Sequence, residues 1–157
     1  MAGSTVPVTL DLTTEDLSIS ILRGIENMHR RDVPLKAAEV LESGDWAVLN
    51  ASGEAERAGA TPVAESFPVF LGTERFDVSA TGQVTLIMND DVIIKSSKFD
   101  PAPTYAIGDA LTVKDLGGGE STPTKQSGAE PVLARVLEIG PNDEYLTYRL
   151  VGSSTGN

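Results

Sequence analysis

The chain has 157 residues, a length that suits one domain with or without a short arm. Its formal net charge is −11, from 23 acidic and 12 basic side chains, which argues against nucleic acid and anionic membrane surfaces as partners. It has no cysteine, which excludes disulfides and thiolate chemistry, and no apolar run long enough to span a membrane.

Residues 1–36 differ in character from the rest of the chain. They carry four basic and five acidic side chains, a net charge of −1, whereas residues 37–157 carry eight and eighteen, a net charge of −10. Segment 6–12 alternates and suits a short edge strand, where Pro7 is tolerated. The apolar residues of segment 17–25 fit a strand as well as a helix, and polar, irregular sequence follows. We expect an extended N-terminal arm with little core of its own, ordered against a neighbouring subunit.

Two Gly-Asp turns, at Gly44-Asp45 and Gly108-Asp109, stand directly before alternating apolar strands. Glycine supplies backbone angles that other residues resist, and aspartate can accept hydrogen bonds within the turn that it helps to form. Segments 50–60 and 116–128 have the composition of loops. Strands are predicted by alternation and β-branched residues over segments 35–40, 46–49, 67–71, 84–88, 92–95, 111–113, 131–139 and 145–151.

About eight strands at intervals of roughly 8–12 residues, with no long helix, are typical of a barrel or sandwich. The sequence therefore predicts an all-β fold, a small antiparallel β-barrel or sandwich over residues 37–152. The extended arm over residues 1–36 precedes it, and a disordered tail over residues 153–157 follows it.

Residue types that carry chemistry are few. The single histidine, His29, lies in the polar arm, where no rigid element would hold it against a nucleophile. Segment 89–91 (Asn-Asp-Asp) suits a hairpin turn better than a calcium loop, whose ligands alternate, and one histidine without cysteine argues against zinc. The glycines of segment 117–119 lack the lysine of a phosphate-binding loop. Trp46 is expected in the core rather than on a glycan-binding surface. The sequence predicts no enzyme and no cofactor.

The strand that follows the second Gly-Asp turn (segment 105–113) and the closing strands 131–139 and 145–151 come after an irregular arm and within a compact β body. In these respects the chain resembles the decoration, or cement, proteins that stabilise the heads of tailed bacteriophages. The resemblance implies a virion structural protein without enzymatic activity. It would bind the capsid exterior as a homotrimer and clamp neighbouring subunits of the major capsid protein.

If the chain is such a protein, the arm supplies its contacts with the capsid. Its apolar edge would join a neighbouring sheet, and its cations would face an acidic capsid surface. The residues expected to make these contacts are Val8, Leu10, Leu12, Arg23, His29, Arg30, Arg31 and Lys36. The alternatives that stay open are another phage structural component, such as a tail-tube or head-fibre protein, and a carbohydrate-binding β module.

Overall fold

The computed structural model describes residues 19–23, 30–70, 82–88, 91–117 and 120–151. Within these ranges the chain forms eleven strands in three sheets and no α-helix, and the strands pair in antiparallel fashion. The predicted all-β fold is confirmed, with more strands than the roughly eight expected from their spacing. No helix in the described ranges is long and apolar enough to cross a membrane.

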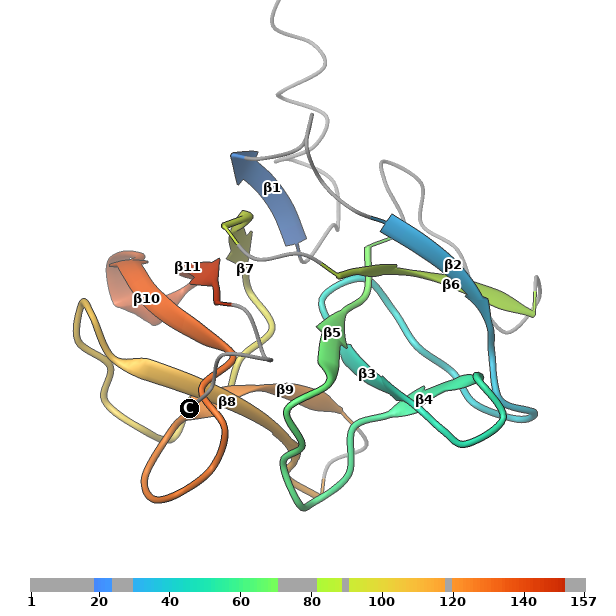
Figure 1. The fold of residues 1–157 in the computed structure, drawn as a ribbon. Helices are drawn as coiled ribbons and strands as arrows, with labels where there is room; N and C mark the ends of the chain where they lie inside the picture. Colours follow the sequence, from blue (N-terminus) through green and yellow to red (C-terminus); the bar gives the residue numbers. More distant parts are fainter. Residues whose placement is uncertain (1–18, 24–29, 71–81, 89–90, 118–119, 152–157) are drawn as a thin grey trace, which may run out of the picture.

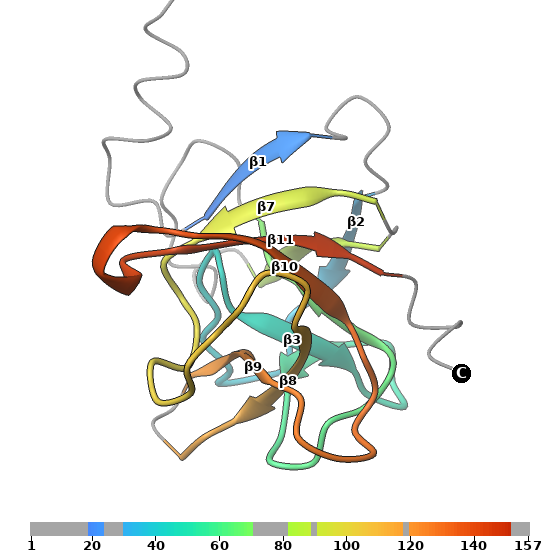
Figure 2. The ribbon, with the colours of Figure 1, turned by 90° about the vertical axis from the view of Figure 1, so that its left-hand side faces the viewer.

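The largest sheet has six strands in the order β1-β7-β11-β10-β8-β9. Its strands are β1 (Ile19–Arg23), β7 (Ile93–Ser96), β11 (Leu146–Leu150), β10 (Ala134–Ile139), β8 (Ala110–Asp115) and β9 (Ser121–Lys125). Figure 2 views the molecule from the side on which β10 and β11 lie. The hairpin that joins these two strands is closed by a short 3₁₀ turn, Pro141–Asp143.

The other two sheets close into a small barrel. One sheet pairs β2 with β6, and the other has the order β4-β3-β5. An antiparallel bridge between Val69 and Leu86 joins the chain after β5 to β6, and a parallel bridge between Leu35 and Ala55 joins the chain after β2 to β4. Five strands thereby form a ring, seen on the right of Figure 1. They are β2 (Arg30–Pro34), β3 (Trp46–Leu49), β4 (Ala55–Arg57), β5 (Ser66–Pro68) and β6 (Gln83–Ile87).

Strand β3 is the wall that two hydrophobic clusters share. Trp46 and Val48 belong to the cluster packed against the six-stranded sheet, whereas Ala47 and Leu49 belong to the cluster inside the barrel. This alternation follows from the two-residue period of a strand. Trp46 is 2 % exposed, so the prediction that it belongs to the core is confirmed.

Both Gly-Asp turns have the geometry that the sequence predicts. Gly44 and Gly108 have φ angles of 98° and 92°, in the region that favours glycine. In each turn the aspartate amide donates to the carbonyl three residues earlier, at 3.0 Å for Asp45 and 3.1 Å for Asp109. One carboxylate oxygen of each aspartate accepts from the amide of that same earlier residue, at 2.9 and 2.8 Å. These reciprocal hydrogen bonds fix the chain as it enters β3 and β8.

Part of the predicted arm is built into the body. Strand β1 pairs with β7 at one edge of the six-stranded sheet, and β2 pairs with β6 over five residue pairs. The sequence around β2 is polar, yet Val33 is 2 % exposed and packs inside the barrel. Residues 30–35 therefore contribute to a core, although the sequence predicted little core for the arm.

Two segments predicted as loops contain strands, and one predicted strand is mostly a turn. Strand β4 lies within segment 50–60, and β9 lies within segment 116–128. Of the predicted strand over segment 35–40, only Leu35 makes a strand bridge. Ala38 has a φ of 67°, a left-handed conformation that no extended strand can contain.

Candidate functional site

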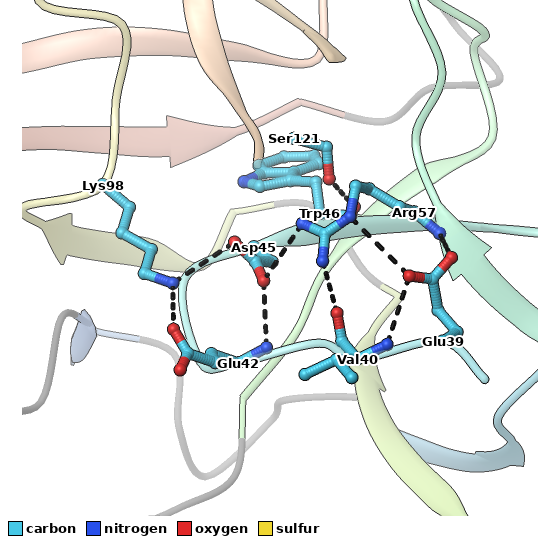
Figure 3. Close-up of polar contacts among 8 residues, drawn as sticks. All are labelled: Glu39, Val40, Glu42, Asp45, Trp46, Arg57, Lys98 and Ser121. Atoms are coloured by element: carbon cyan, nitrogen blue, oxygen red, sulfur yellow. Dashed lines mark hydrogen bonds and ion pairs between the residues drawn. The ribbon is translucent and has the colours of Figure 1, made fainter. Parts of the chain in front are cut away.

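The carboxylate of Asp45 is buried in a group of ionic contacts (Figure 3). Only 3 % of its side chain is exposed. Its Oδ1 lies 3.3 Å from Lys98 Nζ, and its Oδ2 lies 3.6 Å from Arg57 Nη1. Lys98 Nζ also lies 2.8 Å from Glu42 Oε1. One buried carboxylate is thus shared by two cations, and Lys98 is also shared with a second carboxylate.

Arg57 connects this group to the chain before the first Gly-Asp turn. Its Nε lies 3.7 Å from Glu39 Oε1, its backbone N–H donates to Glu39 Oε2 at 3.0 Å, and its guanidinium donates to the carbonyl of Val40. We call Glu39, Glu42, Asp45, Arg57 and Lys98 the Asp45 cluster. Arg57 lies on β4 of the barrel, and Lys98 follows β7 of the six-stranded sheet. The cluster therefore ties the barrel to the sheet.

Burial and charge act differently on the two central groups of this cluster. Burial raises the pKa of Asp45, and this effect outweighs the hydrogen bond from Glu42 and the attraction of Lys98 and Arg57. Burial alone would lower the pKa of Lys98, but its hydrogen bond to Glu42 and the charges of Asp45 and Glu42 together raise it. The charged partners outweigh burial at Lys98 but not at Asp45, because Lys98 is the less buried of the two and faces two carboxylates.

This arrangement is that of a structural ion network. Perturbed pKa values often mark catalytic sites, but they also occur in structural ion networks, and here each charge is engaged by other parts of the fold. A nearby hydrogen bond also joins the barrel to the six-stranded sheet, because the hydroxyl of Ser121 on β9 donates to the carbonyl of Trp46 on β3. Buried pairs of this kind cost desolvation energy, and removing one partner leaves a charge without compensation.

The capsid-contact residues predicted from the sequence are only partly described. Arg31 is exposed on β2, and Lys36 is half exposed, with its Nζ 3.4 Å from Glu56 Oε2. The backbone places Arg23 at the end of β1 and Arg30 at the start of β2. The first strand belongs to the six-stranded sheet and the second to the barrel. The remaining predicted contacts, which lie outside the described residues, are Val8, Leu10, Leu12 and His29.

The second Gly-Asp turn presents an apolar side chain to solvent. Ile107 is 73 % exposed at its tip. The turn is held by a hydrogen bond from the Gly108 amide to the Val136 carbonyl at 2.8 Å. An ion pair of 3.1 Å between Lys125 Nζ and Asp109 Oδ2 also holds it. The same Gly-Asp chemistry therefore supports a buried cluster at one position and an exposed apolar tip at the other.

Sequence reasoning missed a row of basic residues on the outward face of the six-stranded sheet. Arg135 of β10 lies directly opposite Arg149 of β11, which lies opposite Ile93 of β7. Ile93 is in turn opposite Arg23 of β1. The neighbours of Arg135 and Arg149 on their strands are buried in the core, so these two side chains point away from it. We call Arg135 and Arg149 the basic row.

The cations of this row are compensated unequally. Arg149 Nη1 lies 3.0 Å from Oδ1 of Asp91, a residue whose side chain is 79 % exposed. Arg135 is exposed, and its Nη1 donates to the carbonyl of Gly108 at 3.2 Å. In the described part of the chain Arg135 has no ion pair. Like charges directly opposite each other weaken a sheet, so this row favours an added negative charge.

The structure shows no metal-binding group among the residues that it describes. Asp91, the one described residue of segment 89–91, is the partner of Arg149. No protein-family model, curated protein or solved structure matches the chain. Its function therefore has to be inferred from its own residues.

Proposed function

We propose that this chain is a structural protein of a tailed-phage virion that binds the outer surface of the capsid. In this role it stabilises the capsid by clamping neighbouring subunits of the major capsid protein. The observation that carries the proposal is the anchoring of the arm. Its last part supplies β1 to the edge of the six-stranded sheet and β2 to the wall of the barrel.

Anchoring matters because a clamp must transmit force. An arm that holds a neighbouring subunit is useful only if tension on the arm is passed to the folded body and does not detach the arm from it. Strand β1 is paired with β7 from Ile19–Ser96 to Arg23–Ile93, and β2 with β6 from Arg30–Ile87 to Pro34–Gln83. Force on residues before β1 would therefore load the backbone hydrogen bonds between β1 and β7 first, and the pairing of β2 with β6 would hold the chain after β1 had separated.

The barrel and the six-stranded sheet together form a body that could anchor the arm of such a clamp. Its two hydrophobic clusters share β3, and the Asp45 cluster connects the barrel to the six-stranded sheet. A protein that binds the assembled lattice and not free subunits stabilises that lattice by mass action. Several linked copies would add avidity without any single tight contact.

The exposed cations of the arm supply charge for such a contact. Arg31 and Lys36 project from an otherwise acidic molecule, close to the point where β2 enters the barrel. Exposed charges of this kind mainly increase the rate and specificity of association and are sensitive to salt. We expect binding to capsids to weaken as the ionic strength rises.

The test uses capsids assembled without this protein. Removing residues 1–36 would also remove β1, β2 and the buried Val33, so the informative truncation removes residues 1–18 and keeps both strands. We expect the full chain to bind the capsids and to raise the temperature at which they release DNA. The truncated chain should fold, as judged by circular dichroism, and bind at least about tenfold more weakly.

Two results would contradict the proposal. The first is a full chain that does not bind the capsids. The second, which would remove the role of the arm, is equal occupancy by the truncated and full chains in electron micrographs. The double variant Arg31→Glu/Lys36→Glu separates charge from chain length, because it keeps every residue of the arm and reverses only two exposed cations.

A further inference from the structure

We propose that the basic row binds the acidic tip of the β10–β11 hairpin of a second copy of this chain. The tip is formed by Asp143 and Glu144, which are both exposed. In Figure 2 the end of the β10–β11 hairpin projects from the body at the left of the view. One hairpin thus carries the two cations of the basic row on its strands and two exposed carboxylates at its turn.

The two charged regions are far enough apart to act separately. Arg135 and Ile139 are four residues apart on β10, which at about 3.3 Å per residue corresponds to about 13 Å. This distance exceeds the screening length of about 8 Å at physiological ionic strength. The tip therefore cannot neutralise the row of its own molecule, but the tip of another molecule could lie directly against it.

An apolar residue lies between the charged regions. The register of β10 and β11 shifts between Val136 and Glu138, and this bulge leaves Leu137 without a partner on β11. Leu137 is 38 % exposed. Glu138, the next residue along β10, is also exposed, and its Oε1 accepts a hydrogen bond from the Thr147 hydroxyl at 3.1 Å. Specific interfaces combine an apolar centre with a polar rim, and Leu137 and Glu138 offer side chains of both kinds here. Antiparallel docking of two hairpins would bring the two Leu137 side chains together and pair each row with the opposite tip.

The tip is held in shape before it binds. A Cβ on Gly140 would lie 2.4 Å from two ring carbons of Tyr145, so the ring packs directly on the glycine. Lys95 Nζ lies 4.0 Å from the centre of the same ring. The Gly140 amide donates to the Tyr145 carbonyl at 2.9 Å, and the Asp143 amide donates to the Gly140 carbonyl at 3.1 Å. A preorganised turn loses little entropy on association.

Net charge determines the salt concentrations at which this association is strongest. Each copy carries −11, so copies repel one another at long range. At about 0.15 M salt this repulsion is screened beyond about 8 Å, whereas ion pairs at contact distance are screened much less. We expect self-association that is weakest at very low salt, where repulsion dominates, and weak again at high salt, where the contacts themselves are screened.

The experiment is a charge exchange followed by sedimentation velocity of the full chain at about 0.15 M salt. Arg135→Glu/Arg149→Glu should weaken self-association at least about tenfold, and Asp143→Lys/Glu144→Lys should do the same, because each variant places like charges together. Mixing the two variants should restore association as a one-to-one assembly, since a reversed row then meets a reversed tip. Lys36→Glu/Lys114→Glu is the control for the reversed row, because it makes the same change of net charge at two positions outside the hairpin.

The sedimentation measurement uses no capsids, so absence of self-association is distinct from failure of the proposed function. A wild-type chain that stays monomeric, or two variants that do not associate when mixed, would overturn the inference. Reversal of the row that leaves self-association intact but abolishes binding to capsids would also overturn it, because the row would then belong to an acidic capsid surface. The same holds if the row proves to be required for binding duplex DNA in a gel-shift assay.

Discussion

The carboxylate of Asp45 shows how burial and charge compete at a single residue. It accepts a backbone hydrogen bond from Glu42 and faces Lys98 and Arg57, and yet its pKa is raised because it is almost completely removed from water. An exposed aspartate with the same partners would have a lowered pKa. The Asp45 cluster therefore orients the barrel and the sheet at the cost of desolvating a charge, and we expect this cost to depend on pH.

The pH dependence has a definite sign. A carboxylate whose pKa is higher in the folded than in the unfolded state binds protons more readily when folded, so its contribution to stability falls as the pH rises from about 3.8 through the folded pKa. Asp45→Asn removes this titration. We expect the free energy of unfolding of the wild type, minus that of the variant, to decrease as the pH rises above about 3.8.

Urea unfolding of both proteins over a series of pH values tests this expectation. Glu65→Gln is the control, because it removes a carboxylate from an exposed position. A difference that increases with pH would contradict the account, since it would mean that the ion pairs to Lys98 and Arg57 outweigh the burial of Asp45.

At the scale of elements, the sequence predicted the strands that bury alternating apolar residues. The strands that overlap predicted segments are β3, β5, β6, β7, β8, β10 and β11. The missed strands lack that pattern. Segment 30–34 is mostly charged, and β9 contains Pro123 among serine and threonine. Ser121, Thr122 and Thr124 are nevertheless buried, because neighbouring elements cover this edge. Such burial is a tertiary effect that no local pattern contains.

The basic row could not be predicted for a related reason. Both strands of its hairpin were predicted, but their register depends on the bulge between Val136 and Glu138. Without that bulge, continuing back from the pair Ile139–Leu146 would set Arg135 opposite Leu150, whose side chain lies in the core. One inserted residue therefore decides which face Arg135 occupies.

The hairpin turn offers a test of packing at this scale. Gly140→Ala would place a methyl group against the ring of Tyr145, which must move and lose its contact with Lys95. Overpacking of this kind costs about 1–3 kcal/mol, which we expect as a loss of free energy of unfolding in urea. Gly59→Ala is the matched control, because no atom lies within 4 Å of a Cβ at that position. Equal stability of the two variants would show that the Tyr145 ring is not fixed against Gly140.

For the whole molecule, the shared strand β3 suggests that barrel and sheet unfold together. Its side chains alternate between the two clusters, and the Asp45 cluster and the bond from Ser121 to Trp46 cross the same boundary. Neither half can lose its core without exposing one face of β3. The clamp proposed for the capsid needs this property, because an anchor that unfolds in parts would yield under load.

The single tryptophan makes cooperativity measurable. Trp46 belongs to the cluster against the six-stranded sheet, whereas Leu86 lies inside the barrel and is 0 % exposed. Leu86→Ala should destabilise the protein by about 2–5 kcal/mol. We expect the fluorescence transition of Trp46 in urea to shift as far as the circular-dichroism transition of the whole chain, because both report one event. Val63→Ala, at a position 43 % exposed, should shift neither signal appreciably. A Trp46 transition that stays in place while the dichroism transition moves would mean that the two halves unfold independently, and that the interface along β3 is too weak to carry force between them.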